Sequence, residues 1–550
     1  MIKRIKDFLN ERIMKVSIKD IITLVIILLV YSIISFYKLG NNYAPQTFYE
    51  GKKGEEIIIS LENEDDIIRM KLYTGRNAGA VKIYLSNNNK DYELFEEYSL
   101  YWTFSWEDYR IAKKAKYIKL ELEDETSIGE IALFNNNKEY IKVETINNEY
   151  NYLFDEKETV PDKRSYMNSS YFDEYYFARS AYEYVNGYKT NEWTHPPLGK
   201  IIEAIPIYIT HKMTPFNYRL MGNLSGILLI GVMYIFGALL FEKRKYAISS
   251  SLLMFLDTFH FAQTRMGTVD SHLVLFITLG IMFMYLFITK EKIRYLILSG
   301  IFFSLSVSIK WTGLYGGIAL AIMYFIYLIK NKRINIKYLS LGTLLFVILP
   351  LTIYTSVYLI FSNNYYKTNN IKNIILEQEK MYKFHSSNDL EHDYSSKWYT
   401  WPISYKPVWM HLSGITQNSK EIISGVGNII IWYMGVIAFI FMLIKLIKKK
   451  DKTSFYLILP ILSLWLPYIF IPRPMFLYHF FPVLPFYFLG VVYLFKNIEE
   501  KYNIKSLTFL YIIACSIFFI IYYPVVSGKE INNEKIAKLE LFDTWQFDGE

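Results

Sequence analysis

Residues 171–200 read YFDEYYFARSAYEYVNGYKTNEWTHPPLGK, and they place an acidic pair, a short amphipathic helix and a His-Pro-Pro turn between two apolar regions. Asp173 and Glu174 precede aromatic and small side chains at helical spacing, which predicts a helix lying on a membrane surface. Pro196 and Pro197 require an extended turn before the next apolar run. Acids at a helix start also complement the helix dipole, so the pair alone equally fits a purely structural role.

The composition of the whole chain predicts an integral membrane protein. Of 550 residues, 52% are hydrophobic and 18% aromatic, which is more apolar than ordinary soluble enzymes. The net charge is +8, but the Lys and Arg clusters lie between apolar runs, where they indicate membrane topology rather than nucleic-acid binding. The one cysteine, Cys515, excludes a disulfide within the chain and a thiolate zinc site.

Apolar runs of spanning length predict about eleven transmembrane helices. The first run, Ile21 to Tyr37, follows a basic amphipathic N-terminus, and no small-residue cleavage site comes after it, so it is expected to remain as a membrane span. The other spans are expected near residues 218–241, 246–263, 269–288, 295–308, 313–329, 338–361, 426–447, 454–471, 475–495 and 507–523.

Alternate loops between these spans are rich in Lys and Arg, which is typical of cytoplasmic loops. With an odd number of spans, this pattern predicts a cytoplasmic N-terminus and a multi-pass protein of the cell membrane. The acidic pair, the large loop of residues 362–425 and the C-terminal tail then lie on the extracytoplasmic face. A transferase on that face needs an activated donor delivered by lipid. The basic loops are at residues 243–245, 290–294, 330–333, 448–450 and 496–505.

Residues 45–160 differ from the apolar regions because polar and apolar residues alternate between turn signals, which predicts a β-sandwich of about seven strands. Residues 115–135, AKYIKLELEDETSIGEIALFN, resemble part of a discoidin or galactose-binding-like jelly roll. Binding of a sugar or acceptor and a spacer role both remain open for this insert. The expected strands are 56–61, 67–73, 80–85, 92–98, 117–122, 127–134 and 140–145.

The predicted organisation is therefore a polytopic α-helical membrane protein with an inserted extracytoplasmic β-sandwich. Its expected parts are a basic N-terminus with the first span, the β insert, a catalytic outer loop with interfacial helices, spans 2–7, a large outer loop, spans 8–11 and an outer tail. In that order the boundaries are 1–40, 45–160, 165–215, 216–361, 362–425, 426–524 and 525–550.

Ionisable side chains within or beside spans mark candidate sites because lipid makes them costly. Asp257 and His260 lie one helical turn apart and fit either a functional pair or a polar contact between helices. Arg219 and Arg473 have an alternative as residues that extend toward the interface. A cationic rim around one carboxylate suits an anionic lipid headgroup. The residues expected at the same outer face as Asp173 are Arg219, Arg265, Asp270 and Lys310.

Several of these motifs together resemble the protein O-mannosyltransferases. F-D-E followed by H-P-P-L-G-K is similar to the family's first lumenal loop, through Phe172, Asp173, Glu174, His195, Pro196, Pro197, Leu198 and Lys200. FNYRLMGNLSG, FLDTFHFAQTRMGTVDSHL and SIKWTGL match further family segments through Arg219, Asp257, Arg265, Asp270, Ser271, Lys310, Trp311 and Gly313. HDYSSKWYTWPISYKPVWMH resembles the bacterial family's outer loop through His392, Tyr394, Ser396, Trp401, Pro402, Pro407, Val408 and Trp409, with Asp393 and Lys406 departing from it.

The resemblance implies a GT-C-type fold and transfer of mannose, with inversion, from a polyprenyl-phosphate carrier to Ser or Thr of exported proteins. It implies catalytic roles for Asp173 as base and Glu174 as orienting group. Arg219, Arg265 and Lys310 are the candidates for the donor phosphate. His195, His392, Tyr394 and Trp401 are expected to position the acceptor or the loops. The resemblance specifies no cofactor, and Glu174 leaves open a divalent cation, Mg or Mn. The eukaryotic family's MIR β-trefoil is absent from this sequence.

Two alternatives remain on the sequence alone. A transferase of the same architecture could modify a glycolipid or cell-wall polymer, and the acidic loop would not distinguish it. A membrane receptor or transporter could use the β insert to bind a ligand, but it would leave the acidic pair without a function. The sugar, the carrier length, the acceptor and the oligomeric state are not encoded in any motif.

Overall fold

The computed structural model describes residues 17–145, 148–366, 370–387, 392–416 and 418–547. These residues form two compact units. The helical unit contains residues up to Tyr37, residues 192–202 and everything from Met221 onward. The β unit contains residues 38–191 and 203–220. The basic N-terminal segment expected before the first span lies largely outside the described residues.

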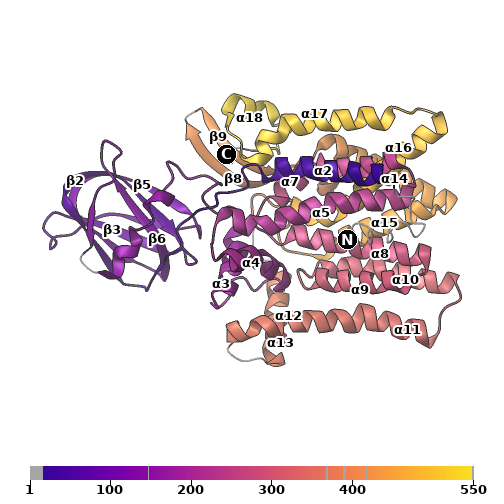
Figure 1. The fold of residues 1–550 in the computed structure, drawn as a ribbon, viewed down its shortest axis with the longest axis horizontal. Helices are drawn as coiled ribbons and strands as arrows, with labels where there is room; N and C mark the ends of the chain where they lie inside the picture. The colour runs from indigo at the N-terminus through magenta and orange to yellow at the C-terminus, as the bar shows by residue number, and fades with distance from the viewer. Residues whose placement is uncertain (1–16, 146–147, 367–369, 388–391, 417, 548–550) are drawn as a thin grey trace. The chain divides into compact units, whose positions relative to one another are not determined.

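Long apolar helices make up most of the helical unit, where they run alongside one another (Figure 1). The principal helices are α2 Ile18–Phe36, α5 Pro215–Phe241, α6 Arg244–Phe255, α7 Thr258–Thr264, α8 Asp270–Lys290, α9 Ile293–Val307, α10 Gly313–Lys330, α11 Ile336–Thr343, η3 Leu344–Ile348, α12 Leu349–Tyr366, α14 Ile429–Lys449, α15 Lys452–Trp465, α16 Leu484–Tyr502 and α17 Leu507–Ser527. The smaller elements are α13 Ile371–Ser386, η4 Trp398–Ile403, η5 Leu466–Phe470, η6 Leu477–Val483, β8 Val408–Thr416, β9 Ser419–Gly425, β10 Ile531–Asn532 and α18 Asn533–Leu539.

Nine helices in the described residues are long and apolar enough to cross a membrane, which confirms the polytopic fold. Two of the eleven expected spans are different in detail. The span expected at 295–308 is α9, a helix of 15 residues. The span expected at 246–263 is interrupted at Asp257 and continues as α7, so it is two short helices.

The interruption at Asp257 has a local cause. Its Oδ2 accepts the His260 backbone N–H at 3.0 Å, which caps α7. Its Oδ1 accepts the Trp432 indole N–H at 2.7 Å and the Asn428 backbone N–H at 3.1 Å. A broken helix at membrane depth needs such internal partners for its polar groups. Asp257 therefore acts structurally here, and His260 contacts the Tyr31 hydroxyl through Nδ1 at 3.2 Å.

The β unit contains one antiparallel sheet in the order β1-β6-β2-β5-β3-β4, with β7 paired to β2 (Figure 1). Apolar and polar side chains alternate along its strands, so one face is buried. The buried face includes Ile57, Leu72, Ile118 and Ile131. The strands are β1 Tyr49–Gly51, β2 Glu56–Thr74, β3 Ala80–Ser86, β4 Glu93–Ser99, β5 Trp106–Leu122, β6 Thr126–Phe134 and β7 Val143–Thr145.

Two long strands allow this single sheet to fold over its own core. β2 has 19 residues and β5 has 17, and they pair along most of their length. Register shifts lie between Ser60 and Asp65 and between Ile67 and Arg69, and such bulges bend a strand and increase its twist. The expected β domain is thus confirmed, although the first two strands predicted separately are one bent strand.

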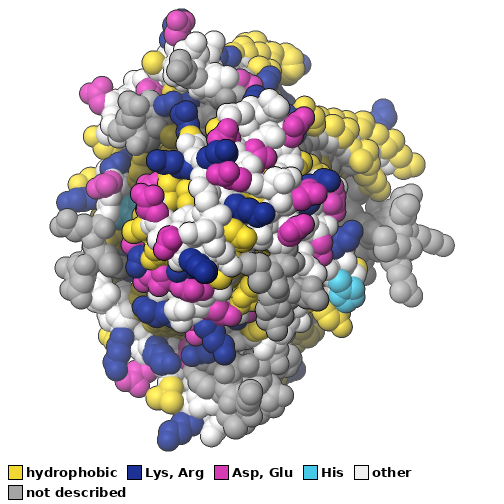
Figure 2. Space-filling model, turned by 90° about the vertical axis from the view of Figure 1, so that its left-hand side faces the viewer, with side chains coloured by type: hydrophobic (Ala, Val, Ile, Leu, Met, Phe, Trp, Pro, Cys, Tyr) yellow, Lys and Arg dark blue, Asp and Glu magenta, His cyan; other side chains and the backbone are white. Residues whose placement is uncertain are grey.

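The exposed face of the β unit carries acidic and basic side chains mixed together, without a large area of one sign (Figure 2). Several of them pair across the sheet, including Lys119 with Glu56 at 2.7 Å and Arg69 with Asp108 at 3.2 Å. Mixed charge of this kind favours a solvated surface and gives no electrostatic indication of a polyanionic partner.

Helix α3 (Glu174–Val185) packs into the β unit. Its Ala178 and Ala181 share a buried cluster with Trp106, the first residue of β5, and with Phe104 just before it. The apolar face that its spacing predicts for a membrane surface is therefore covered by protein. Other elements of this unit are η1 Asn148–Leu153, η2 Lys157–Thr159 and the second half of α4 (Leu198–Thr210).

Candidate active site

Asp173 stands at the N-cap position of α3, where the chain turns sharply. The preceding residue, Phe172, has a φ of 50°, which is uncommon for a residue with a side chain. The backbone carbonyl of Asp173 accepts the amides of Tyr176 and Phe177 at 3.0 and 3.1 Å. Its half-buried carboxylate makes no capping hydrogen bond to the helix. Asp173 therefore stands at the helix start without closing it through a side-chain hydrogen bond.

Glu174 is fully buried and forms a bidentate ion pair with Arg219, which lies in the first turns of α5. Arg219 Nε donates to Oε1 at 2.6 Å, and Nη2 donates to Oε2 at 2.8 Å. The Tyr171 backbone N–H also donates to Oε2 at 3.1 Å. A bidentate pair of this kind fixes both the position and the orientation of its carboxylate.

The rest of the Arg219 guanidinium holds the chain that precedes Asp173. Nη1 donates to the carbonyls of Leu39 and Tyr166 at 3.0 and 2.7 Å, and Nη2 donates to the carbonyl of Ser169 at 3.0 Å. The side chain is 0% exposed. In this arrangement Arg219 holds Glu174 and the loop backbone, whereas the sequence had suggested a contact with the donor phosphate.

The His-Pro-Pro turn belongs to the helical unit and is held from both sides. Lys200 is buried and donates to the carbonyl of His195 at 2.8 Å and to the carboxylate of Glu192. The rings of His195 and His385 stack with centroids 5.5 Å apart and planes 18° from parallel. His385 also donates through Nε2 to the carbonyl of Thr194 at 2.8 Å. Helix α13, which carries His385, thus contacts the turn directly.

Positive charges surround these two histidines. Desolvation, together with Lys310, His385, Lys200 and Arg473, holds the pKa of His195 well below its usual range. Desolvation, with Arg473 and Lys310, lowers the pKa of His385 to about 4. Both rings are therefore neutral at pH 7, and the positive charge of this cluster comes from Lys and Arg.

Lys310 is largely buried and paired with one acid. Its ammonium donates to both oxygens of Asp270 at 2.8 and 3.0 Å, and it lies 5.9 Å from the ring centre of Tyr478. Arg473 lies over the ring of Phe384, 5.8 Å from its centre. The structure thus brings together Lys310, Arg473 and the histidines as a cationic cluster within the helical unit.

Arg265, another expected phosphate ligand, lies at the ends of two helices. Its Nε and Nη2 donate to the carbonyls of Ser35 and Tyr37 at 3.0 and 2.9 Å, at the end of α2. Its Nη1 donates to the carbonyl of Ser527 at 3.2 Å, at the end of α17. A cation at helix C-termini is favoured by the helix dipole, so these contacts account for Arg265 without a ligand.

The aromatic outer loop docks through Trp401, which is 0% exposed. Its ring stacks on His479 with centroids 5.8 Å apart and planes 15° from parallel, and its indole N–H donates to the Ser396 hydroxyl at 3.0 Å. His392 is exposed and contacts Phe476 edge-on at 4.9 Å, while Tyr394 stacks on Trp409 at 6.1 Å. Trp401 is thus an anchor of this loop, and the other two lie nearer its surface.

No three His, Cys, Asp or Glu side chains within the described part of the chain are arranged to hold a metal ion. Both oxygens of Glu174 already engage Arg219. A divalent cation at Glu174 would therefore have to compete with this ion pair.

Sequence reasoning did not single out His385, Glu192 or the full role of Arg219. His385 lies in a polar helix with no recognisable motif, and Glu192 precedes the His-Pro-Pro turn within an ordinary-looking polar stretch. The His-Pro-Pro turn separates Glu192 from Lys200, so no regular helix or strand relates them and only the folded turn reveals their pairing.

Comparisons with known proteins match the helical unit over most of its length. Residues 193–366 match the family model described as dolichyl-phosphate-mannose-protein mannosyltransferase. Residues 370–545 match the model described as the C-terminal four-transmembrane region of protein O-mannosyltransferase. Neither model extends to Asp173 and Glu174, which precede both.

Individual relatives agree with these matches. The polyprenol-phosphate-mannose–protein mannosyltransferase of Mycolicibacterium smegmatis is 20% identical over 439 residues, covering 66% of this chain and 84% of the relative. The structure of the S. cerevisiae Pmt1-Pmt2 complex bound to the sugar donor matches with a TM-score of 0.59 and 12% identity. That match covers 69% of this chain and 89% of the yeast chain, and it supports the fold. The chain is a member of the protein O-mannosyltransferase family, with a GT-C-type membrane fold and an inserted β domain.

Proposed function

We propose that this protein transfers mannose from a polyprenyl-phosphate carrier to a Ser or Thr hydroxyl of an acceptor protein, with Asp173 as the general base. The family match supports the donor and the protein acceptor. The observation that carries the assignment of the base is the pair of acids at the start of α3. Glu174 is fully buried and held by Arg219, and the half-buried Asp173 stands beside it at the N-cap position of α3.

The acceptor hydroxyl is a weak nucleophile, so a base must take its proton as the new bond forms. The oxygen of Ser or Thr bonds to the anomeric carbon of mannose, and its proton passes to the Asp173 carboxylate. The bond between that carbon and the phosphate oxygen breaks on the opposite face of the sugar, so the configuration inverts. One carboxylate is sufficient, unlike the two that glycosidases use.

The leaving group is the polyprenyl phosphate, whose departure requires neutralisation of negative charge more than a proton. We assign Lys310 and Arg473 to this role because they supply the positive charge beside the His-Pro-Pro turn. His195 and His385, both neutral, are assigned to orient the turn and to donate hydrogen bonds. Arg219 is assigned to position Glu174 and the loop, and Arg265 to hold helix ends.

Water would hydrolyse the activated sugar, so the site must exclude it. We assign this role to the aromatic loop anchored by Trp401, with His392 and Tyr394 placed to contact the acceptor. Placement of the reaction on the extracytoplasmic face follows from the basic loops and belongs to the same proposal.

The test uses membranes containing the full-length protein, radiolabelled polyprenyl-phosphate mannose and a Ser/Thr-rich peptide. We expect label in the peptide with the wild type and none above background with Asp173→Asn. Label that accumulates in a lipid or polymer fraction, with the peptide unlabelled, would replace the protein acceptor with the glycolipid alternative.

A further inference from the structure

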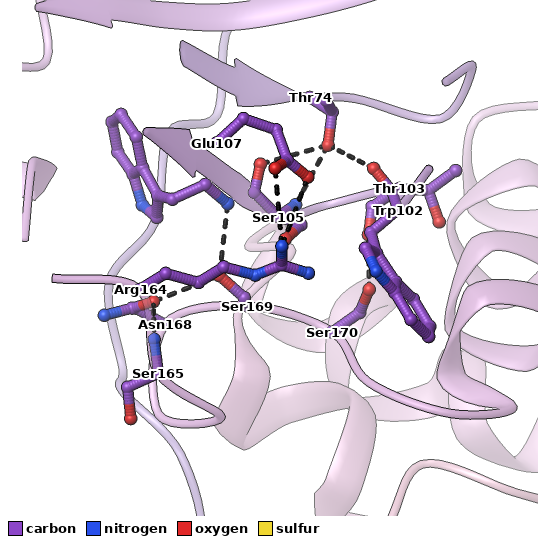
Figure 3. Close-up of polar contacts among 11 residues, drawn as sticks. Thr74, Trp102, Thr103, Ser105, Glu107, Arg164, Ser165, Asn168, Ser169 and Ser170 are labelled. Atoms are coloured by element: carbon purple, nitrogen blue, oxygen red, sulfur yellow. Dashed lines mark hydrogen bonds and ion pairs between the residues drawn. The ribbon is translucent and has the colours of Figure 1, made fainter. Parts of the chain in front are cut away.

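The β domain lies directly against the loop that carries the acidic pair, and the contacts are made by main-chain groups at the start of β5 (Figure 3). The Ser170 amide donates to the Phe104 carbonyl at 3.0 Å, and its hydroxyl donates to the Thr103 carbonyl. The Trp106 amide donates to the Ser169 hydroxyl at 3.1 Å. Ser170 therefore pairs with the residues just before β5, two positions before Phe172 in the turn that presents Asp173.

Arg219 forms hydrogen bonds with the other side of the same loop. That guanidinium donates to the carbonyls of Tyr166 and Ser169, and it is also the partner of Glu174. Residues 165–170 thus lie between the β5 start and Arg219. A displacement of the sheet would move the carbonyls that orient Arg219 together with the chain that leads to Asp173.

Two strained backbone positions mark this junction. Phe104, on the sheet side, and Phe172, on the loop side, both have a φ of 50°. Left-handed backbone in residues other than glycine is costly and persists only where surrounding contacts enforce it. Phe104 is fully buried in the cluster that includes Trp106, Ala178 and Ala181. Packing in this cluster therefore holds the Phe104 backbone in its left-handed conformation.

The segment that bears β5's first residues is itself rigidly held. The Ser105 amide donates a hydrogen bond to the Thr74 hydroxyl at 3.1 Å. The Thr74 amide donates in turn to the Ser105 carbonyl at 2.9 Å. Glu107 pairs with Arg164 at 3.3 Å, which adds a second tie just before the loop (Figure 3). Thr103 reaches further and donates its hydroxyl to the carbonyl of Tyr175, within α3, at 3.3 Å.

We infer that the β domain is a positioning element of the transferase itself, and that the Thr103–Trp106 segment sets the placement of Asp173 through Ser169 and Ser170. The inference rests on the proposed role of Asp173 as base. It differs from a ligand-binding role for the insert, because the contacts that carry it are internal to the chain and adjacent to the catalytic acid.

Ser169 and Ser170 are positioning residues in this account, since neither is assigned to touch substrate. The Ser169→Ala/Ser170→Ala double variant removes both hydroxyl contacts and leaves the acids in place. We expect its single-turnover transfer rate to fall at least ~10-fold while donor affinity stays unchanged, because small displacements of a reacting group cost rate rather than binding. Ser86→Ala is the matched control, since Ser86 is a buried serine of β3 whose hydroxyl bonds to Asn88.

Asp173→Asn, measured in the same assay, separates this inference from the proposed function. If Asp173→Asn is inactive and the double variant transfers at the wild-type rate, the positioning role is wrong and the proposed base stands. If Asp173→Asn is as active as the wild type, the base assignment itself fails. If Ser86→Ala lowers the transfer rate as much as the double variant does, the effect is general destabilisation and the inference is overturned.

Should the double variant fail to fold, Thr103→Val provides a second test. Valine matches the shape of threonine but removes the hydroxyl contact to the Tyr175 carbonyl. We expect a lower transfer rate at unchanged donor affinity, and restoration by Thr103→Ser, which keeps the hydroxyl. A Thr103→Val protein with the wild-type rate would contradict the inference.

Discussion

Arg219 and Glu174 form a fully buried ion pair in which two hydrogen bonds, of 2.6 and 2.8 Å, join one guanidinium to one carboxylate. The remaining guanidinium hydrogens hold three backbone carbonyls of the surrounding chain. The pair therefore links the acidic loop to the first turns of α5, and its loss should affect structure and catalysis together.

Removing both members of this pair should destabilise the protein less than the sum of the two single removals. Arg219→Met leaves a buried carboxylate without its partner, which costs about 3–5 kcal/mol. The Arg219→Met/Glu174→Gln double variant should lose about 1–3 kcal/mol less than the sum of the two single variants, because the two side chains interact directly. Equilibrium unfolding in detergent measures this difference, and additive losses would contradict the pairing.

Lys310 should matter for the donor rather than for the acceptor. In the proposed site Lys310 donates a charge-assisted hydrogen bond to the donor phosphate, and such a bond is worth about 1.5–3 kcal/mol. Lys310→Met removes it, so donor affinity should weaken roughly 10- to 100-fold. The measurement is competition by polyprenyl phosphate in the transfer assay. Lys330→Met is the control, since Lys330 is exposed at the other end of α10. Unchanged donor affinity in Lys310→Met would remove Lys310 from the phosphate site.

Glu130 should make the β unit sensitive to alkaline pH. Its side chain is 0% exposed in β6, and desolvation raises the pKa of Glu130 to about 8. The folded state binds this proton more tightly than the unfolded state, so the stabilisation is present at acidic pH and is lost as pH rises toward and through 8.

Glu130→Gln removes that titration while keeping an acceptor for the Glu156 amide. We expect the wild-type melting temperature to fall between pH 6 and pH 9, and the variant to show a smaller decrease and to melt higher than the wild type at pH 9. Glu125→Gln, an exposed neighbour, should follow the wild type. Equal pH dependence in Glu130→Gln and the wild type would show that this carboxyl is not the source.

Trp401 should anchor the aromatic loop. Truncation of a buried aromatic residue costs about 3–5 kcal/mol, so Trp401→Ala should lower the melting temperature strongly and increase protease cleavage within residues 392–416. Tyr399→Ala, on the same turn but 58% exposed, should change stability by less than about 0.5 kcal/mol. Similar melting temperatures for the two variants would contradict the anchoring role.

The fold was predictable where apolar patterning is strong. The membrane helices follow from long apolar runs, and β3 follows from alternation. The patterning fails in the first part of β5, where Lys113, Lys114 and Lys116 make the strand look like a loop, although Ala115 is buried among them. It also fails at Asp257, because Trp432 and Asn428, which donate hydrogen bonds to its other carboxylate oxygen, lie more than 170 positions away in the sequence.

The candidate site residues stand out in the sequence, but their partners do not. Asp173, Glu174 and His195 stand out because acids and a His-Pro-Pro turn interrupt an apolar chain. The pairing of Glu174 with Arg219, 45 positions later, and the stacking of His195 on His385 depend on tertiary contacts. Arg219 and Arg265 stand out in the sequence as charges beside apolar runs. Their carbonyl partners do not, because every residue has a backbone carbonyl and no side-chain pattern marks the ones that are bound.

The central claim is that the Asp173 carboxylate accepts the proton of the acceptor hydroxyl. The most direct measurement is single-turnover transfer by Asp173→Asn with donor bound beforehand, together with its affinity for the donor. General-base catalysis contributes about 10²- to 10⁴-fold, so the transfer rate should fall at least ~100-fold while donor affinity stays near the wild-type value. A variant that transfers mannose at the wild-type rate would contradict the account.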